Sequence, residues 1–254
     1  MERQIVIGSA FRGPPTSGNG GYVCGLMAGL LGDSHERAPV TGILRAPIPL
    51  EAPLRVSVDG QHVRLTAVTG ELIAEAVVDN GLRLPVPPCA PLFTDAEIAG
   101  REFVGLHRPF HPICFTCAEG LAEGVGLRVF TGPIEGDPDD VVAGVWLPHQ
   151  AFADDQGLTR LEVVWAALDC PGSVAWLERG GQGGLLGTMT CKVLRRPAVG
   201  EACIVTAWPI ETSGRKSLSG TALFSHAGEL LARSHQIWIG RAADSDTRGV
   251  AIAF

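Results

Sequence analysis

The sequence has no run of about 18 apolar residues, so it is not expected to contain a membrane-spanning helix. Its lysines and arginines are scattered, and the formal net charge is −7, which argues against nucleic-acid binding and against a polybasic membrane patch. The N-terminus, Met1–Gly8, becomes polar too quickly for a signal peptide. We therefore expect a cytoplasmic protein that neither binds nucleic acid nor inserts into a membrane.

A disulfide framework is not expected either, because the seven cysteines are odd in number and irregularly spaced. A reduced chain is the simpler interpretation. Hydrophobic residues make up 46% of the sequence and charged residues 19%, which predicts a packed core rather than disorder. The 254 residues suffice for one large domain or for two domains of about 100–150 residues.

The sequence contains an internal repeat. Two strand-rich stretches, Gly42–Ala76 and Cys191–Ser234, each contain a Gly-Glu-Leu segment just before their last strand. A hydrophobic helix candidate precedes each stretch, at Tyr22–Leu31 and at Leu161–Leu177, and Pro171 predicts a kink or an end in the second helix. A repeat of this size indicates one supersecondary unit used twice, and the face shared by two such units is a natural place for a functional site.

The strands of both units follow the pattern of antiparallel meanders. In the first unit the pattern runs from Val40 to Val78, with a hairpin turn at Asp59-Gly60, and in the second from Leu185 to Ile239. Between the two meanders, the proline-rich stretch Pro85–Pro91 predicts a linker. The following residues to Gly126 are expected to be irregular. The predicted organisation is a first unit at 1–84, a linker and irregular insert at 85–126, and a second unit at 127–254.

Several short segments resemble those of the tandem, or double, hotdog acyl-CoA thioesterases. Asn19–Gly25 is similar to the Gly-Gly helix start of the family's first unit, and Trp165–Asp169 to the helix acid of single-unit hotdog thioesterases. Glu211-Thr212-Ser213 looks like the turn with the catalytic hydroxyl, and Leu231–Gln236 like the strand with the catalytic Gln. The resemblance implies an α+β fold, a double hotdog in which each unit wraps a curved antiparallel sheet round a central helix. It also implies hydrolysis of acyl-CoA thioesters without a cofactor.

The resemblance assigns catalytic roles to Asp169, Thr212 and Gln236. It assigns substrate binding to Asn19-Gly20-Gly21 and to Thr190. Glycines at a helix N-terminus can donate backbone N–H groups to the oxyanion that develops on a thioester carbonyl. An acid in an apolar helix is costly unless it is paired or working, so Asp169 is a candidate general base or nucleophile. The structural alternatives are a tight turn at the glycines and a hydrogen-bonded acid beside the kink at Pro171.

The two copies differ in these residues. The first helix has the Gly-Gly start but Ala28 at the position equivalent to the acid, whereas the second helix has Asp169 and no Gly-Gly. We therefore expect one site per chain, shared between the units. The family resemblance also leads us to expect a carboxylate on the strand after the second helix. Thr188–Cys191 has none there, so water activation would fall to Asp169.

Other functions remain open at this stage. A non-catalytic acyl-CoA or fatty-acyl binding protein is one alternative, and a hotdog hydratase or dehydratase is another, although the Gly-Asp-x-Asn-Pro-x-His segment of that class is missing. Cys170 lies beside Asp169, but no nearby His identifies it as a nucleophile. Homodimers or higher homo-oligomers are plausible. No metal ligand is assigned, because the potential zinc ligands of one loop are better explained by a structural loop: His107, His111, Cys114 and Cys117.

Overall fold

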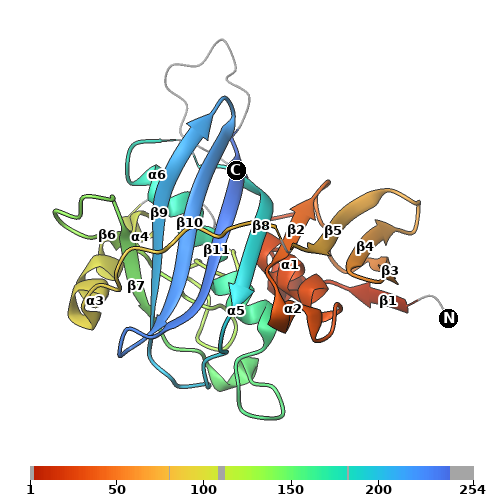
Figure 1. Ribbon diagram of the computed structural model, residues 1–254, viewed down its shortest axis with the longest axis horizontal. Coiled ribbons are helices and arrows are strands. Elements are labelled where there is room, and N and C mark those ends of the chain that lie inside the picture. The colour runs from red at the N-terminus through yellow and green to blue at the C-terminus, as the bar shows by residue number, and fades with distance from the viewer. Residues whose placement is uncertain (1–2, 80, 108–111, 182, 241–254) are drawn as a thin grey trace.

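The computed structural model describes residues 3–79, 81–107, 112–181 and 183–240. Within them, one antiparallel sheet of 11 strands has the order β1-β3-β4-β5-β2-β8-β11-β10-β9-β7-β6. Figure 1 shows the long strands β8 to β11 in front of helices α5 and α6, and the first-half strands to the right of them. The first half of the sheet therefore consists of β1 to β5 and the second of β6 to β11.

The elements follow the chain in two similar series. The first half contains β1 (Arg3–Val6), η1 (Ser9–Phe11), α1 (Gly20–Gly29), α2 (Ser34–Arg37), β2 (Val40–Leu44), β3 (Pro53–Asp59), β4 (His62–Ala67) and β5 (Leu72–Val78). The second contains α3 (Phe93–Arg101), α4 (Val104–His107), β6 (Gly132–Pro133), β7 (Val142–Trp146), η2 (Gln150–Phe152), α5 (Leu161–Ala167), α6 (Asp169–Leu177), β8 (Leu185–Val193), β9 (Cys203–Ser213), β10 (Lys216–Ser225) and β11 (Leu230–Ile239). Both predicted meanders and both predicted central helices are confirmed.

The hydrogen bonds show that the two series are copies of one unit. Before α1, Arg12 and Gly18 form an isolated bridge, and before α5 the bridge is between Ala153 and Thr159. After β2, the carbonyl of Ile73 accepts bonds from two successive N–H groups, at residues 45 and 46. After β8, the carbonyl of Leu231 does the same with residues 194 and 195. These matches fix which residues are equivalent, with Asn19 corresponding to Arg160 before the helices.

The two halves of the sheet join at β2 and β8. These strands run antiparallel, and Thr41 lies opposite Thr190. Thr41 lies four residues before Arg45, and Thr190 lies four residues before Leu194. Because Arg45 and Leu194 are equivalent, the two threonines are equivalent as well. Their Oγ1 atoms are 2.8 Å apart, which marks the approximate twofold axis between the units.

The central helices differ from the expected ones for local reasons. α1 starts at Gly20, two residues earlier than predicted, because the Oδ1 atom of Asn19 accepts the N–H of Tyr22 at 2.8 Å and caps the helix. The second helix is broken at Leu168, as α5 ends at Ala167 and α6 starts at Asp169. Pro171 has no N–H to donate and its ring crowds the carbonyl of Ala167, whereas it is tolerated in the first turn of α6.

The chain between the units crosses the outer face of the second half of the sheet. In Figure 1 it passes in front of β8 to β11, and the guanidinium of Arg233 donates to the carbonyl of Pro85 at 3.4 Å. Residues 81–92 form no regular element, as their prolines predict. The following stretch was expected to be irregular and instead contains α3 and α4. Ala96 and Ala99 bury one face of α3, a pattern too small and too weakly apolar to be recognised in the sequence. The boundaries at 84 and 126 stay predictions.

All seven cysteines are free. In the part of the chain that the structure describes, no helix combines the length and apolar character needed to cross a membrane.

Candidate active site between the two units

The site is built on the contact between α1 and α5, which pack antiparallel through glycines. A Cβ atom added to Gly25 would lie 2.6 Å from the Cα of Glu162. One added to Gly21 would lie 2.7 Å from the Cβ of Asp169 and 2.8 Å from the carbonyl oxygen of Trp165. Real Cβ atoms do not approach other atoms so closely, so only glycine permits this packing. The contact brings the N-terminus of α1 onto the first residue of α6.

Asp169 is the acid at this junction. Its side chain is 4% exposed, and its Oδ2 atom accepts the N–H of Gly21 at 3.0 Å. Among the described residues, no hydrogen-bond partner contacts its buried Oδ1 atom. Loss of solvent raises the pKa of Asp169 to about 7, although the Gly21 N–H opposes the shift. A carboxyl group with this pKa can exchange a proton near neutral pH.

A cavity of about 380 Å³ opens beside Asp169. Both units contribute to its walls, and Asn19 and Gly20 from the start of α1 lie on the same cavity as Asp169. Much of the remaining wall is apolar, with Leu44, Pro47 and Ile48 from the first unit and Leu177, Leu186 and Trp238 from the second. A polar end and apolar walls are typical of a site for a small molecule with an apolar part.

The start of α1 presents one unused backbone donor to this cavity. The N–H groups of Gly21 and Tyr22 are bonded to Asp169 and Asn19. Among the described residues no partner accepts the N–H of Gly20, which lines the cavity. Gly20, rather than Gly21, is therefore the donor available to a ligand.

Asn19 is anchored by a residue that the sequence analysis missed. Its Nδ2 atom donates to the hydroxyl of Thr116 at 3.2 Å, and that hydroxyl donates to the carbonyl of Ala166 at 2.9 Å. Thr116 thus ties the start of α1 to α5. It lies in the loop that was expected to be irregular, and no local pattern singles it out.

Gln236 contacts Leu168, the residue before the acid, but does not line the cavity. Its Nε2 atom donates to the carbonyl of Leu168 at 2.6 Å, and its Oε1 atom accepts the indole N–H of Trp238 at 2.9 Å. Leu168 is the residue at which α5 and α6 are broken. Gln236 therefore holds the backbone next to Asp169, while Trp238 forms the wall.

The structure does not bring the two predicted threonines to the cavity. Thr212 is exposed near the end of the β9–β10 hairpin, and Thr190 lies on the seam between the units. The hydroxyl-bearing residues that line the cavity are Thr16, Ser17 and Ser173. Of these, Ser173 lies four residues after Asp169 and on the same side of α6. This spacing is the signal that the sequence analysis overlooked.

Three cysteines gather beside the acid. The sulfur atoms of Cys114, Cys117 and Cys170 all lie within 4.8 Å of one another, and those of Cys114 and Cys170 are 3.5 Å apart. Hydrogen bonds from the other two thiols hold the pKa of Cys114 below its ordinary value. Of the histidines in the candidate loop, His107 is exposed on α4 and His111 lies outside the described residues.

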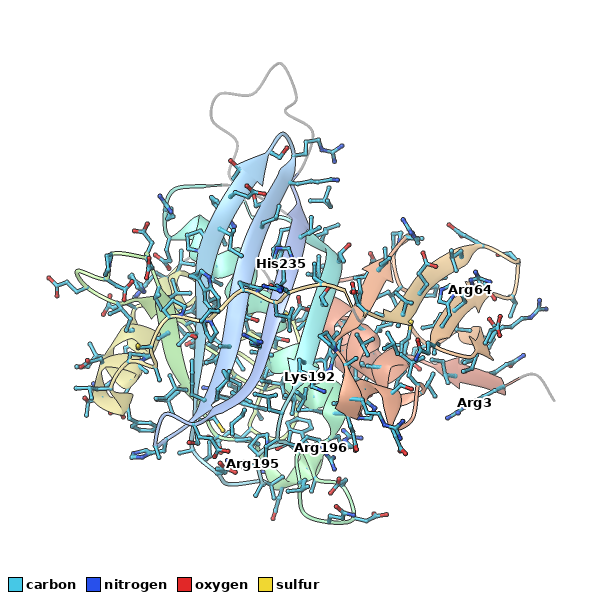
Figure 2. All side chains as sticks on the ribbon, viewed as in Figure 1. Arg3, Arg64, Lys192, Arg195, Arg196 and His235 are labelled. Atoms are coloured by element: carbon cyan, nitrogen blue, oxygen red, sulfur yellow. The ribbon has the colours of Figure 1, made fainter. Side chains whose placement is uncertain are left out.

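None of the basic side chains labelled in Figure 2 lines the cavity. His235 lies on the outer face of the second half of the sheet, opposite to the helices. Arg195 is bonded to Glu201 and Glu229, and Arg196 to Asp154. The positive charges of Arg195 and Arg196 are thus used in ion pairs with neighbouring carboxylates.

Comparisons with known proteins agree with this architecture. No protein-family model matches the sequence, and a search of curated proteins finds no match. Many solved structures are similar to this chain, among them the following three, which match over nearly its whole length. A conserved protein of unknown function with a hot dog fold from Alicyclobacillus acidocaldarius has a TM-score of 0.59 at 15% identity, covering 94% of this chain and 92% of that one. The acyl-CoA thioesterase II TesB2 from Mycobacterium marinum has a TM-score of 0.53 at 17% identity, with 91% and 92% covered. A tesB protein from Mycobacterium avium subsp. paratuberculosis has a TM-score of 0.57 at 15% identity, with 89% and 88% covered.

These similarities establish the fold. The chain is a double-hotdog protein of the α+β class, with two units joined edge to edge through β2 and β8. The resemblance found in short sequence segments is thereby confirmed at the level of the whole fold.

Proposed function

We propose that this protein hydrolyses acyl thioesters, with acyl-CoA as the substrate class. The observation that carries the proposal is the meeting of Asp169 with the N-terminus of α1 on one cavity. Two chemically complementary groups, a buried acid and a free backbone donor, come there from different units. This geometry fits the shared site that the family resemblance implies, in which one unit supplies the backbone donors and the other supplies the acid.

The chemistry begins with the thioester carbonyl next to Gly20. The Gly20 N–H donates to the carbonyl oxygen, and the positive end of the α1 dipole stabilises the negative charge that develops on it. The ionised Asp169 accepts a proton from a water molecule, which attacks the carbonyl carbon. The carbon–sulfur bond then breaks, and the proton that Asp169 took from the water passes to the departing sulfur. The products are a thiol and a carboxylic acid, and Asp169 is ionised again.

The cavity walls suit the acyl chain. Apolar side chains from both units line the space beyond Asp169, so an acyl chain placed there is removed from water. Ser173 lies on the same wall as the acid, within reach of a ligand in the cavity. We expect this hydroxyl to orient the attacking water in place of the distant Thr212.

A non-catalytic acyl-CoA binding protein is the second candidate. It is favoured by the positions of Thr190 and Thr212 outside the cavity, and by the amide of Gln236, whose polar atoms are already bonded within the protein. The same cavity would then bind the acyl thioester without cleaving it. A cytoplasmic location and a homo-oligomeric state stay predictions.

Thiol release from a panel of acyl-CoAs of different chain length tests both candidates. We expect turnover by the wild type and a loss of about 10²–10⁴-fold in Asp169→Asn, which keeps an acceptor for the Gly21 N–H but has no base. Glu162→Gln, at the equivalent of Gly21 on the other helix, is the matched control and should stay within about twofold. Tight binding without turnover establishes the binding protein instead, and full activity in Asp169→Asn refutes the proposed site.

A further inference from the structure

The cysteine cluster combines residues from two distant parts of the chain. Cys114 and Cys117 belong to a Cys-x-x-Cys loop between α4 and β6, and Cys170 is the second residue of α6. The three side chains are 1%, 5% and 9% exposed. The break between α5 and α6 places Cys170 next to the loop, so the cluster depends on the same kink that positions Asp169.

We propose that Cys114, Cys117 and Cys170 form a binding site for a thiophilic divalent cation, with zinc as the expected ion. Three thiolates at about 2.3 Å from a tetrahedral zinc ion lie about 3.8 Å from one another. The sulfur atoms here lie within 4.8 Å of one another, with the closest pair at 3.5 Å, so small rotations about the Cα–Cβ bonds complete the site.

The backbone of the loop brings the two loop cysteines together. The N–H group of Ala118 donates to the carbonyl of Cys114 at 3.1 Å, which closes the Cys-x-x-Cys turn. A closed Cys-x-x-Cys turn is a common way to supply two thiolates to one zinc ion. Cys170 lies in the first turn of α6, where the helix dipole favours negative charge.

The cavity determines the fourth coordination position. Cys114 and Cys170 line the cavity and Cys117 lies behind them, so a cation held by all three has its open side toward the cavity. A water molecule from the cavity completes the tetrahedron, as in sites with three protein ligands. Binding releases the thiol protons, so affinity should increase with pH. The loop histidines are not needed, because Cys170 takes the place that the sequence suggested for them.

Cobalt(II) provides a direct test on the reduced, full-length protein. We expect one Co²⁺ per chain, with the intense thiolate-to-cobalt charge-transfer absorption and the visible bands of a tetrahedral ion, and displacement of Co²⁺ by one equivalent of Zn²⁺. Cys117→Ser should weaken cobalt binding by about 100-fold or more. Cys89→Ser, which changes an exposed cysteine outside the cluster, should not change it. Circular dichroism of each variant checks that the fold is kept.

Two results would overturn the site. One is a folded, reduced wild type that shows no charge-transfer band with Co²⁺, and the other is equal loss of binding in Cys89→Ser and Cys117→Ser. In the first case, a thiol oxidant that links Cys114 to Cys170 would show that the cluster is a redox pair instead. The result is independent of thioester hydrolysis, since cobalt binding is measured without substrate.

Discussion

The two ends of the paired central helices occupy equivalent places in the duplicated fold but have different chemistry. At one end, Asn19-Gly20-Gly21 starts α1 and meets Asp169. At the other end, the equivalent residues Arg160-Leu161-Glu162 start α5. Asp169 follows Arg160 by nine residues, and Ala28 follows Asn19 by the same number. The second end therefore has neither the glycines nor the acid.

The difference shows how a duplication supports a single asymmetric site. A buried acid destabilises the folded chain, and here this cost is present at only one of the two equivalent positions. The approach of Gly21 to Asp169 requires a residue without a side chain, and Glu162 at the other end carries a long one. There the polar groups pair with each other, as Arg160 and Glu162 are 3.6 Å apart.

The largest expected effect comes from moving the acid to the other end. In Asp169→Asn combined with Ala28→Asp, thioester hydrolysis should stay at least about 100-fold below the wild type, because no glycine N–H faces residue 28. Thiol release measures the activity, and thermal unfolding of the double variant and of Ala28→Asp checks folding. Recovery of activity would show that the two ends are interchangeable.

Adding a side chain at Gly25 should destabilise the protein more than adding one at Gly29. Gly25→Ala is expected to reduce the free energy of unfolding by about 3 kcal/mol, because the new Cβ atom meets the backbone of Glu162. Gly29→Ala places its Cβ atom 3.7 Å from Leu161, an ordinary contact, and should change stability by less than about 1 kcal/mol. Urea unfolding of both variants makes the comparison. Equal effects would mean that the helices are not in backbone contact.

The pH dependence should report the buried acid. The pKa of Asp169 is raised to about 7 in the folded state, so the rate with ionised Asp169 as base increases as pH rises through 7. For the same reason the folded state retains a proton that the unfolded state loses near pH 4. Wild-type stability therefore falls between pH 4 and 7. When the pH is raised from 5 to 8, the free energy of unfolding of Asp169→Asn should fall by about 2 kcal/mol less than that of the wild type. Urea unfolding at both pH values measures the difference.

The smallest expected effects on the rate concern Gln236 and Thr212, the two other predicted catalytic residues. Gln236→Ala should lower kcat by about tenfold with little change in KM, because the carbonyl of Leu168 and the indole N–H of Trp238 lose their partner and Asp169 shifts. Gln236→Glu keeps an acceptor for Trp238 and should recover only part of the rate. Thr212→Val is the control and should stay within about twofold. A larger effect of Thr212→Val would contradict its position in the structure.

Much of the architecture was predictable because its signals are local. The hairpin glycine Gly60, the alternating strands and the kink before Pro171 depend on residues close together in the chain. The asymmetry between Ala28 and Asp169 was also readable, since the repeat aligns the two helices. The candidate hydroxyl was not, because whether Thr212 or Ser173 faces the cavity depends on how far the hairpin extends and on which side of α6 is buried.

By itself, the sequence determined that one unit is used twice and that the two copies have unequal residues at equivalent positions. Periodicity, glycines and prolines act over a few residues and leave a clear pattern. Only the tertiary structure decided which groups meet. The bond from Gly21 to Asp169 joins residues 148 positions apart, and the cluster of Cys114, Cys117 and Cys170 spans two segments. Such contacts depend on the close packing of two helices and on side-chain direction, and neither is encoded within a single segment.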